Sequence, residues 1–302
     1  MDDALKTSYR FCADLSRREA RNFYYSFVLL PPTLRRSMCA LYAFSRHTDD
    51  LVDEAGTLEV KRAALDHWRA SIDRALTGSP GADWPGLAAL ADTVRRHAIP
   101  RRYIEAVIDG VEMDLEPRRF PTFEDLRGYC DKVASAVGLC CIHIWGFRSE
   151  GGRAEDYAEA CGVALQVTNI LRDIREDAEL GRIYLPEEDM ERFGVQPEDL
   201  LATTPNDRVR ALVAFEAERA SALYEQAKLL GPLVSPVGRP VLATIAGIYH
   251  ALLREIIRRD FDVMSQRVSL PKWRKLAIAL GSLGTRLARS SASAAGTELP
   301  RC

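Results

Sequence analysis

Apolar side chains along this chain recur mostly at spacings of three and four residues, the period of an amphipathic α-helix. Nowhere is the alternation of apolar and polar positions strong enough to predict a β-strand. Prolines and glycines mark the breaks between the periodic segments, as they commonly do at helix ends. The pattern predicts helices over residues 32–54, 57–76, 86–97, 102–115, 123–144, 154–179, 207–230, 239–264 and 272–287.

These segments indicate an all-α protein. With 302 residues, of which 47% are hydrophobic, the chain is long enough to bury a large core. We expect a single domain over residues 1–289, built as a helical bundle around a central cavity. Residues 290–302 are small and polar, and we expect them to form a flexible tail that carries no chemistry.

Polar side chains form a stripe along the predicted helix 154–179. The stripe comprises Gln166, Asn169, Asp173 and Asp177. Their offsets of three, four and four residues place them on one helix face. Acid pairs at this spacing usually belong to a solvated face, but here the intervening residues are apolar and predict a helix embedded in the core. Amide and carboxylate oxygens are ligands that Mg²⁺ prefers, so the stripe predicts a metal site for a phosphorylated ligand.

A second acid stripe lies far upstream, in the predicted helix 32–54. It comprises Tyr42, Arg46, Asp49 and Asp53, again at offsets of three and four. Two such stripes on facing helices can hold Mg²⁺ ions between them, and those ions can bind a diphosphate. Ionisation of a diphosphate from carbon needs this arrangement, because metal ions and arginine neutralise the charge that grows on the departing oxygens.

The two stripes belong to longer motifs that resemble the squalene/phytoene synthase family of head-to-head prenyl transferases. The first motif runs from Arg46 to Asp53, and the second from Gln166 to Asp177, followed by the segment 182–186 (Arg-Ile-Tyr-Leu-Pro). A third element, 129–138, matches the family pattern Tyr-Cys-x-x-Val-Ala-x-x-Val-Gly. The likeness extends from about residue 23 to about residue 274. It implies an enzyme with the all-α isoprenoid synthase fold, and prenyl diphosphate substrates.

The resemblance also implies roles for the motif residues. About two or three Mg²⁺ ions are expected on Asp49, Asp53, Asn169, Asp173 and Asp177. Diphosphate contacts are expected from Arg46, Gln166 and Arg172, and a flap over the diphosphates from Arg182 and Tyr184. The prenyl cavity is expected to be lined by Phe23, Phe27, Tyr42, Tyr129, Val133, Ala134, Val137, Gly138 and Tyr249. The residues expected to act in catalysis are Tyr42, Arg46, Tyr129, Arg172 and Tyr249, and the tyrosine that assists proton removal is left open.

The segments 23–27 and 49–54 resemble those of bacterial presqualene diphosphate and squalene synthases more than those of plant phytoene synthases. We therefore expect condensation of two farnesyl diphosphates through presqualene diphosphate, toward squalene or dehydrosqualene. The alternative is phytoene synthase, which condenses two geranylgeranyl diphosphates, and a more distant one is a non-catalytic helical binding protein. The exact product and a need for NADPH are left open, because helical enzymes that use NADPH also lack the GxGxxG fingerprint that is missing here.

Charge and cysteine usage fit this class of enzyme. The net charge is −2 with no basic run, which argues against a nucleic-acid partner. The seven cysteines lack CxxC spacing, and the acidic start of the chain lacks a secretory signal, so we expect a cytoplasmic protein with reduced cysteines. The most apolar stretch, 240–253, is too short to span a bilayer. Peripheral membrane contact would fit the hydrophobic substrates, although the sequence shows no clear amphipathic anchor. The oligomeric state is left open.

Overall fold

The computed structural model describes residues 2–20, 24–79, 81 and 83–282. Within these residues the regular structure is helical, with one isolated bridge between Phe147 and Val234, so the all-α prediction is confirmed. The α-helices are α1 (Asp3–Glu19), α2 (Tyr24–Phe27), α3 (Pro32–Asp53), α4 (Leu58–Leu76), α5 (Leu87–Arg96), α6 (Arg101–Glu112), α7 (Phe123–Cys130), α8 (Ala136–Trp145), α9 (Arg153–Glu179), α10 (Glu187–Phe193), α11 (Asp207–Ala227) and α12 (Arg239–Arg258). A further helix covers 272–282, and shorter turns are η1 (Met113–Leu115), the π-helical η2 (Asp131–Ser135), η3 (Pro197–Leu201) and η4 (Lys228–Leu230).

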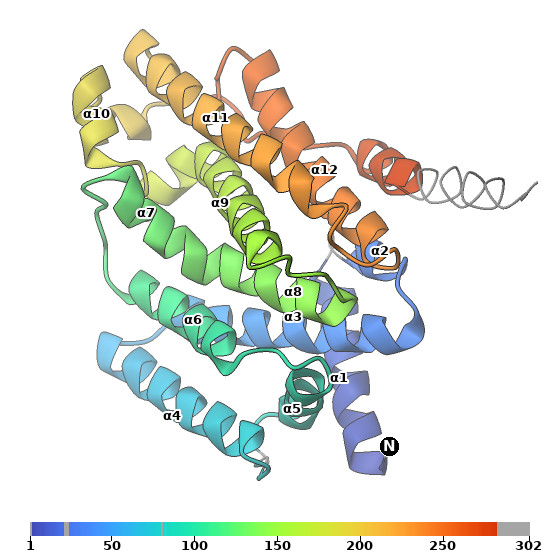
Figure 1. Ribbon diagram of the computed structural model, residues 1–302. Helices are drawn as coiled ribbons and strands as arrows, with labels where there is room; N and C mark the ends of the chain where they lie inside the picture. The colour runs from blue at the N-terminus through green and yellow to red at the C-terminus, as the bar shows by residue number, and fades with distance from the viewer. Residues whose placement is uncertain (1, 21–23, 80, 82, 283–302) are drawn as a thin grey trace, which may run out of the picture.

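Helix α9 lies in the middle of the bundle, where α8, α11, α12 and η2 pack around it (Figure 1). Two apolar clusters of buried side chains make up the core. Ala154 and Ala158, near the start of α9, belong to the cluster shared with α1, α3, α5, α6 and α8. Val167 and Leu171, farther along, belong to the cluster shared with α7, α11 and α12. The helix that carries the predicted metal stripe is therefore fixed by both clusters.

The predicted helices are present, with differences at their ends. α1 was not predicted; Asp2 caps it by accepting the Leu5 N–H at 2.7 Å, and its buried face packs against α3 and α5. The predicted helix 239–264 ends at Arg258, because Asp260 and Phe261 adopt positive φ values of 52° and 59° that a helix cannot continue through.

One predicted helix, 123–144, is divided by a π-helical turn. It begins with a capping box: Thr122 Oγ1 accepts the Asp125 N–H at 3.2 Å, and Asp125 accepts the Thr122 N–H in return. The turn η2 then interrupts the α-helical pattern before α8. Such turns are frequent at functional sites, and this one carries part of the predicted cavity wall.

Helix α12 is longer than the apolar stretch noted in the sequence. It has 20 residues, and by length and hydropathy alone it could cross a membrane. However, 56% of its most apolar window is buried inside the bundle, as in the core helix of many globular proteins. The six cysteines in the described part of the chain are free and buried, which fits the expected packing role.

Candidate active site

Helix α3 presents the first acid stripe because its other side is fixed in the core. Leu41, Phe44 and Val52 are buried, and Trp68 donates its Nε1–H to Thr48 Oγ1 at 3.0 Å. The side chains left partly or fully exposed on the opposite face include Tyr42, Arg46, Asp49 and Asp53. The stripe thus exists as the sequence predicts.

The first stripe has more negative charge than its own arginine can neutralise. Arg46 pairs with Asp50 one turn along, an ion pair that was not predicted. Burial and then the neighbouring charge of Asp53 raise the pKa of Asp49 to about 7, against the opposing effect of Arg46. Solvent nevertheless reaches the Asp49 side chain. A carboxyl surrounded by protein yet open to water is one that a cation can approach.

Helix α9 presents the second stripe between buried residues. Val167, Ile170 and Ile174 are buried. The stripe residues Gln166, Asn169, Asp173 and Asp177 are half-buried, as expected for one shared face. The Asn169 side-chain oxygen Oδ1 is inaccessible to solvent and has no hydrogen-bond partner among the described residues. An orphaned amide oxygen is costly to bury, and a ligand cation would satisfy it.

Asp173 is surrounded by guanidinium groups. Arg172 Nε lies 2.8 Å from Asp173 Oδ1, and Arg267 Nε lies 2.9 Å from the same oxygen. Arg267 also contacts Glu176 Oε2 at 3.1 Å. Burial alone would raise the pKa of Asp173, but the two arginines lower it. Arg267 was not predicted from the sequence, because it lies outside the motifs and reaches Asp173 from the segment after α12.

Asp177 ends the stripe at a turn that sends the chain back toward it. Burial and the charge of Asp173 raise the pKa of Asp177 to about 7, and Arg182 opposes this rise. The Gly181 N–H donates to Ala178 O at 2.9 Å and the Arg182 N–H to Asp177 O at 2.8 Å. These two bonds form a Schellman turn, which needs the positive φ of 75° that Gly181 adopts. Gly181 therefore sets the direction in which the chain continues to Arg182.

We expect Gly181→Ala to lower the free energy of unfolding by about 1 kcal/mol, because a Cβ disfavours positive φ. No atom lies within 4 Å of the added Cβ, so strain rather than a clash is the cause. Chemical denaturation measures the effect. Gly151→Ala, at a φ of 74° with equally open surroundings but away from the stripe, is the matched control. A comparable stability loss in both variants, with turnover reduced only in Gly181→Ala, would support a role for the turn in placing Arg182.

Asp114 connects α7 with the segment that follows α9. It lies in η1 and accepts hydrogen bonds from Tyr129 Oη at 3.0 Å and from Tyr184 Oη at 3.1 Å. Burial raises the pKa of Asp114, while the two tyrosine hydroxyls and Arg182 oppose the rise. The charge of Asp53 also acts on it. Asp114 had no predicted role. The sequence shows only an acid at the end of a predicted helix, and without its hydrogen-bond partners such an acid does not indicate a function.

Aromatic rings line the region around Asp114. The rings of Tyr129 and Tyr184 stack with centroids 5.3 Å apart, and Phe120 packs against both. On the α3 side, the rings of Phe27 and Tyr42 meet edge to face at 6.4 Å. Such rings exclude water, and their faces favour nearby positive charge.

Tyr249, on α12, lies beside the second stripe. Burial raises the pKa of its hydroxyl, and the charge of Arg172 and a hydrogen bond from Asn169 oppose the rise. A tyrosine in this position stays protonated and can donate a hydrogen bond. The structure therefore brings Tyr249 to the amide and arginine of α9, and its expected place in the cavity wall stays a prediction.

The small residues of the third motif lie where the chain passes close to α9. A Cβ on Gly162 would meet the backbone of Ser135 at 2.5 Å, so this glycine permits the contact between α9 and η2. Ser135 Oγ then donates to the Glu159 carbonyl at 3.0 Å. The half-buried residues Val133, Ala134, Val137 and Gly138 surround this point. Close packing against α9 therefore accounts for some of the small side chains in the motif 129–138.

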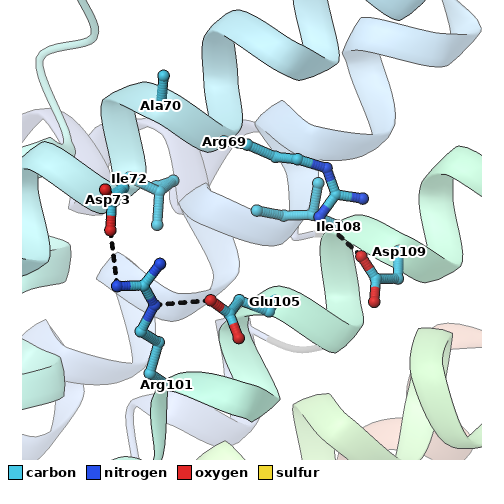
Figure 2. A pocket seen from close by; sticks show the side chains of 8 residues that line it. All are labelled: Arg69, Ala70, Ile72, Asp73, Arg101, Glu105, Ile108 and Asp109. Atoms are coloured by element: carbon cyan, nitrogen blue, oxygen red, sulfur yellow. Dashed lines mark hydrogen bonds and ion pairs between the residues drawn. The ribbon is translucent and has the colours of Figure 1, made fainter.

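A separate cleft of about 410 Å³ lies between α4 and α6 (Figure 2). Arg101 lies between Asp73 and Glu105, at 2.6 Å from each, and Arg69 Nη1 contacts Asp109 at 2.7 Å. The three acids of the cleft share these two arginines, so each of its charged side chains already has a partner. None of its lining residues belongs to either acid stripe.

Comparison with known proteins decides the family. The family model described as squalene/phytoene synthase matches residues 16–274. The chain belongs to the squalene/phytoene synthase family. Among curated relatives, 15-cis-phytoene synthase of Synechococcus elongatus is 36% identical, over 90% of this chain and 91% of its own. Phytoene synthase of Mycobacterium tuberculosis is 35% identical, over 93% and 92%.

Solved structures agree on the fold. A dehydrosqualene synthase in complex with a ligand has a TM-score of 0.84 at 27% identity, covering 94% of this chain and 98% of its own. The squalene synthase HpnC of Alicyclobacillus acidocaldarius has a TM-score of 0.79 at 33% identity, covering 86% and 97%. The protein is therefore a prenyl transferase with the isoprenoid synthase fold, and enzymes of the squalene/phytoene synthase family act on prenyl diphosphates with divalent metal ions.

The stripe residues fit a divalent cation that is completed by substrate oxygens. Asp49 and Asp177 have raised pKa values, and Asn169 Oδ1 lacks a partner in the described region, so all three would gain from a cation. Among the residues that the structure describes, no group of three His, Cys, Asp or Glu side chains is close enough to hold a metal ion alone. Mg²⁺ typically binds through one or two carboxylates plus water and phosphate, which agrees with this donor set.

The specific roles assigned from the sequence stay predictions. Contacts or mutual charge effects connect Asp49, Asp53, Asp114, Tyr129, Asp177, Arg182 and Tyr184. A second group, around Arg172, contains Asn169, Asp173, Tyr249 and the unpredicted Arg267, and the charge effect of Asp173 on Asp177 joins it to the first. Phe23 lies outside the described residues.

Proposed function

We propose that this enzyme condenses two geranylgeranyl diphosphates head to head to form phytoene. The observation that carries the proposal is the similarity to phytoene synthases at 35–36% identity over about nine tenths of the chain. This choice replaces the farnesyl diphosphate reaction expected from the sequence. That reaction stays the second candidate, because dehydrosqualene and squalene synthases share the fold at TM-scores of 0.84 and 0.79.

The chemistry balances without a reductant. Diphosphate leaves the first substrate and gives an allylic cation. The double bond of the second substrate attacks this cation, and loss of a proton gives a cyclopropyl diphosphate. Loss of the second diphosphate, rearrangement and loss of a second proton then give the hydrocarbon. Each departing anion is thus matched by a departing proton, and NADPH is needed only if the final cation is reduced, as on the way to squalene.

The described residues supply the environment for both ionisations. Mg²⁺ would be held by Asp49, Asp53, Asn169, Asp173 and Asp177, and when bound it would neutralise the leaving diphosphate. Three arginines, Arg46, Arg172 and Arg182, lie among these acids and can contact its oxygens. Aromatic rings near Asp114 exclude water, which would otherwise quench the cations to alcohols.

The test is to incubate the purified protein with Mg²⁺ and either farnesyl or geranylgeranyl diphosphate, with and without NADPH, and to identify the products by mass. We expect a forty-carbon hydrocarbon from geranylgeranyl diphosphate, unchanged by NADPH and absent when EDTA is added. A thirty-carbon product formed only from farnesyl diphosphate would contradict the proposal and restore the second candidate.

A further inference from the structure

Two acidic side chains, Asp189 on α10 and Glu216 on α11, are buried together away from both acid stripes. They are only 4% and 1% exposed. One cation contacts both: Arg219 Nη1 lies 2.9 Å from Asp189 Oδ2 and 2.7 Å from Glu216 Oε1. The second Glu216 oxygen, Oε2, is inaccessible to solvent, and no described residue donates a hydrogen bond to it. If both acids were ionised, the cluster would bury one uncompensated negative charge, which is costly.

The other charged and titratable groups around the pair do not offset this charge. Arg119 pairs with Glu187 at 3.1 Å, and Arg192 lies over aromatic rings. On α7, the charge of Glu216 acts on Cys130, but burial raises the pKa of that thiol and keeps it neutral. Helix α9, which packs along α11, contributes apolar side chains to the same core cluster. Arg219 is therefore the cation that the two acids share.

A proton held between the two carboxyl groups would remove the excess charge. The Asp189 carboxyl lies within hydrogen-bonding reach of Glu216. Two ionised carboxylates can only accept hydrogen bonds, so this contact is favourable only when one of them carries a proton. Burial raises the pKa of Glu216 to about 7; Asp189 adds to the rise, and Arg219 opposes it. Glu216 therefore keeps its proton below a pH of about 7.

The pair holds α10 against α11 at a point close to the active site (Figure 1). Helix α10 begins at Glu187, directly after the segment 182–186. This segment carries Arg182 and Tyr184, which contribute charge and a hydrogen bond to the candidate active site. On its other side, α10 is fixed by the Glu187 N–H, which donates to Phe120 O at 2.8 Å. The position of Arg182 and Tyr184 thus depends on how firmly α10 is docked.

We propose that Glu216 and Asp189 share one proton, and that the protonated pair, bound to Arg219, docks α10 and so positions the segment 182–186. Glu216 and Asp189 are positioning residues, because they act through this segment. The device holds whichever prenyl diphosphate the enzyme uses, so it goes beyond the proposed function. Because docking raises the pKa of Glu216 from 4.5 to about 7, docking is strongest below pH 4.5 and weakens as the pH rises to about 7.

The test is hydrogen exchange of the α10 amides in the full-length protein, expressed as protection factors so that the pH dependence of free-amide exchange cancels. We expect protection to fall about tenfold between about pH 6 and about pH 8, as the pair loses its proton. Glu216→Gln should be equally protected at both pH values, because glutamine donates to Asp189 without a titratable proton. Asp189→Asn should also remove the pH dependence. The double variant should lose protection at both pH values, because Arg219 then lacks an anion.

Glu255, on α12, provides the matched control. It is 8% exposed, but three arginines contact it, Arg258, Arg259 and Arg274. Hydrogen bonds from Arg258 and Arg259 lower the pKa of Glu255 to about 2, so it does not titrate in the range of the test. Glu255→Gln should therefore keep the pH dependence of α10 protection that the natural protein shows.

Infrared difference spectra between the two pH values give an independent readout, because the C=O stretch of a protonated carboxyl differs from that of a carboxylate. We expect a protonated-carboxyl band that Glu216→Gln removes and Glu255→Gln keeps. Protection of α10 that does not change with pH in the natural protein, or that changes equally in Glu216→Gln, would overturn the proposal. These measurements use no substrate, so they stand or fall separately from the phytoene assay.

Discussion

Asp49→Asn is expected to lower kcat with prenyl diphosphate and Mg²⁺ by about 10³-fold. A metal ion stabilises the developing charge of a leaving group by several kcal/mol, and each 1.4 kcal/mol is a factor of ten in rate. Asparagine keeps the shape of the side chain but loses the charge that binds the cation. Steady-state release of diphosphate measures the change.

The same substitution should not harm the fold. In metal-free protein the Asp49 carboxyl is destabilised by burial and by Asp53, so removal of its charge should leave the melting temperature in EDTA unchanged or raised. Asp66→Asn, at an exposed acid of α4, is the matched control and should keep full activity. Near-normal turnover of Asp49→Asn would remove Asp49 from the metal site, and a lowered melting temperature would make its activity loss uninformative.

Asp114→Ala is expected to have the second-largest effect, a loss of about 10²-fold in kcat. The substitution removes the acceptor that holds the hydroxyls of Tyr129 and Tyr184. Loss of both hydrogen bonds to a charged, buried group is worth roughly 3 kcal/mol of positioning, since each contributes about 1.5–3 kcal/mol. Asp114→Asn keeps one acceptor oxygen and should recover part of the rate.

A double-mutant cycle separates positioning from simple packing. If Asp114 acts through the tyrosines, Tyr129→Phe/Tyr184→Phe should make the further change Asp114→Asn nearly silent. Asp114→Ala should also alter the pH profile of kcat, which a packing defect alone would leave in place. Additive losses with an unchanged pH profile would contradict the positioning role.

Local spacing explains what could be predicted from the sequence. The stripe on α9 depends only on the helix period, so the spacing of Asn169, Asp173 and Asp177 is enough to place them on one face. The interleaved apolar residues also indicated that the face opposite would be buried. In the same way, Thr122 and Asp125 carry their capping pattern within four residues.

Contacts between distant segments explain what was missed. Asp114 meets Tyr129 and Tyr184 across 15 and 70 residues, and Arg267 meets Asp173 across 94. The periodicity of apolar and polar residues does not indicate such pairings, because they arise from the packing of whole helices.

The shared position of α9 limits how this enzyme can close around its substrates. Ala158 belongs to one apolar cluster and Val167 to the other, on one uninterrupted helix. Rotation of the two halves as rigid bodies would require this helix to bend in the middle of the core, which dense packing resists. Closure must therefore be local, and the buried Leu185 anchors the segment from Gly181 to Pro186 in the second cluster. The two halves should also unfold together, as one cooperative unit.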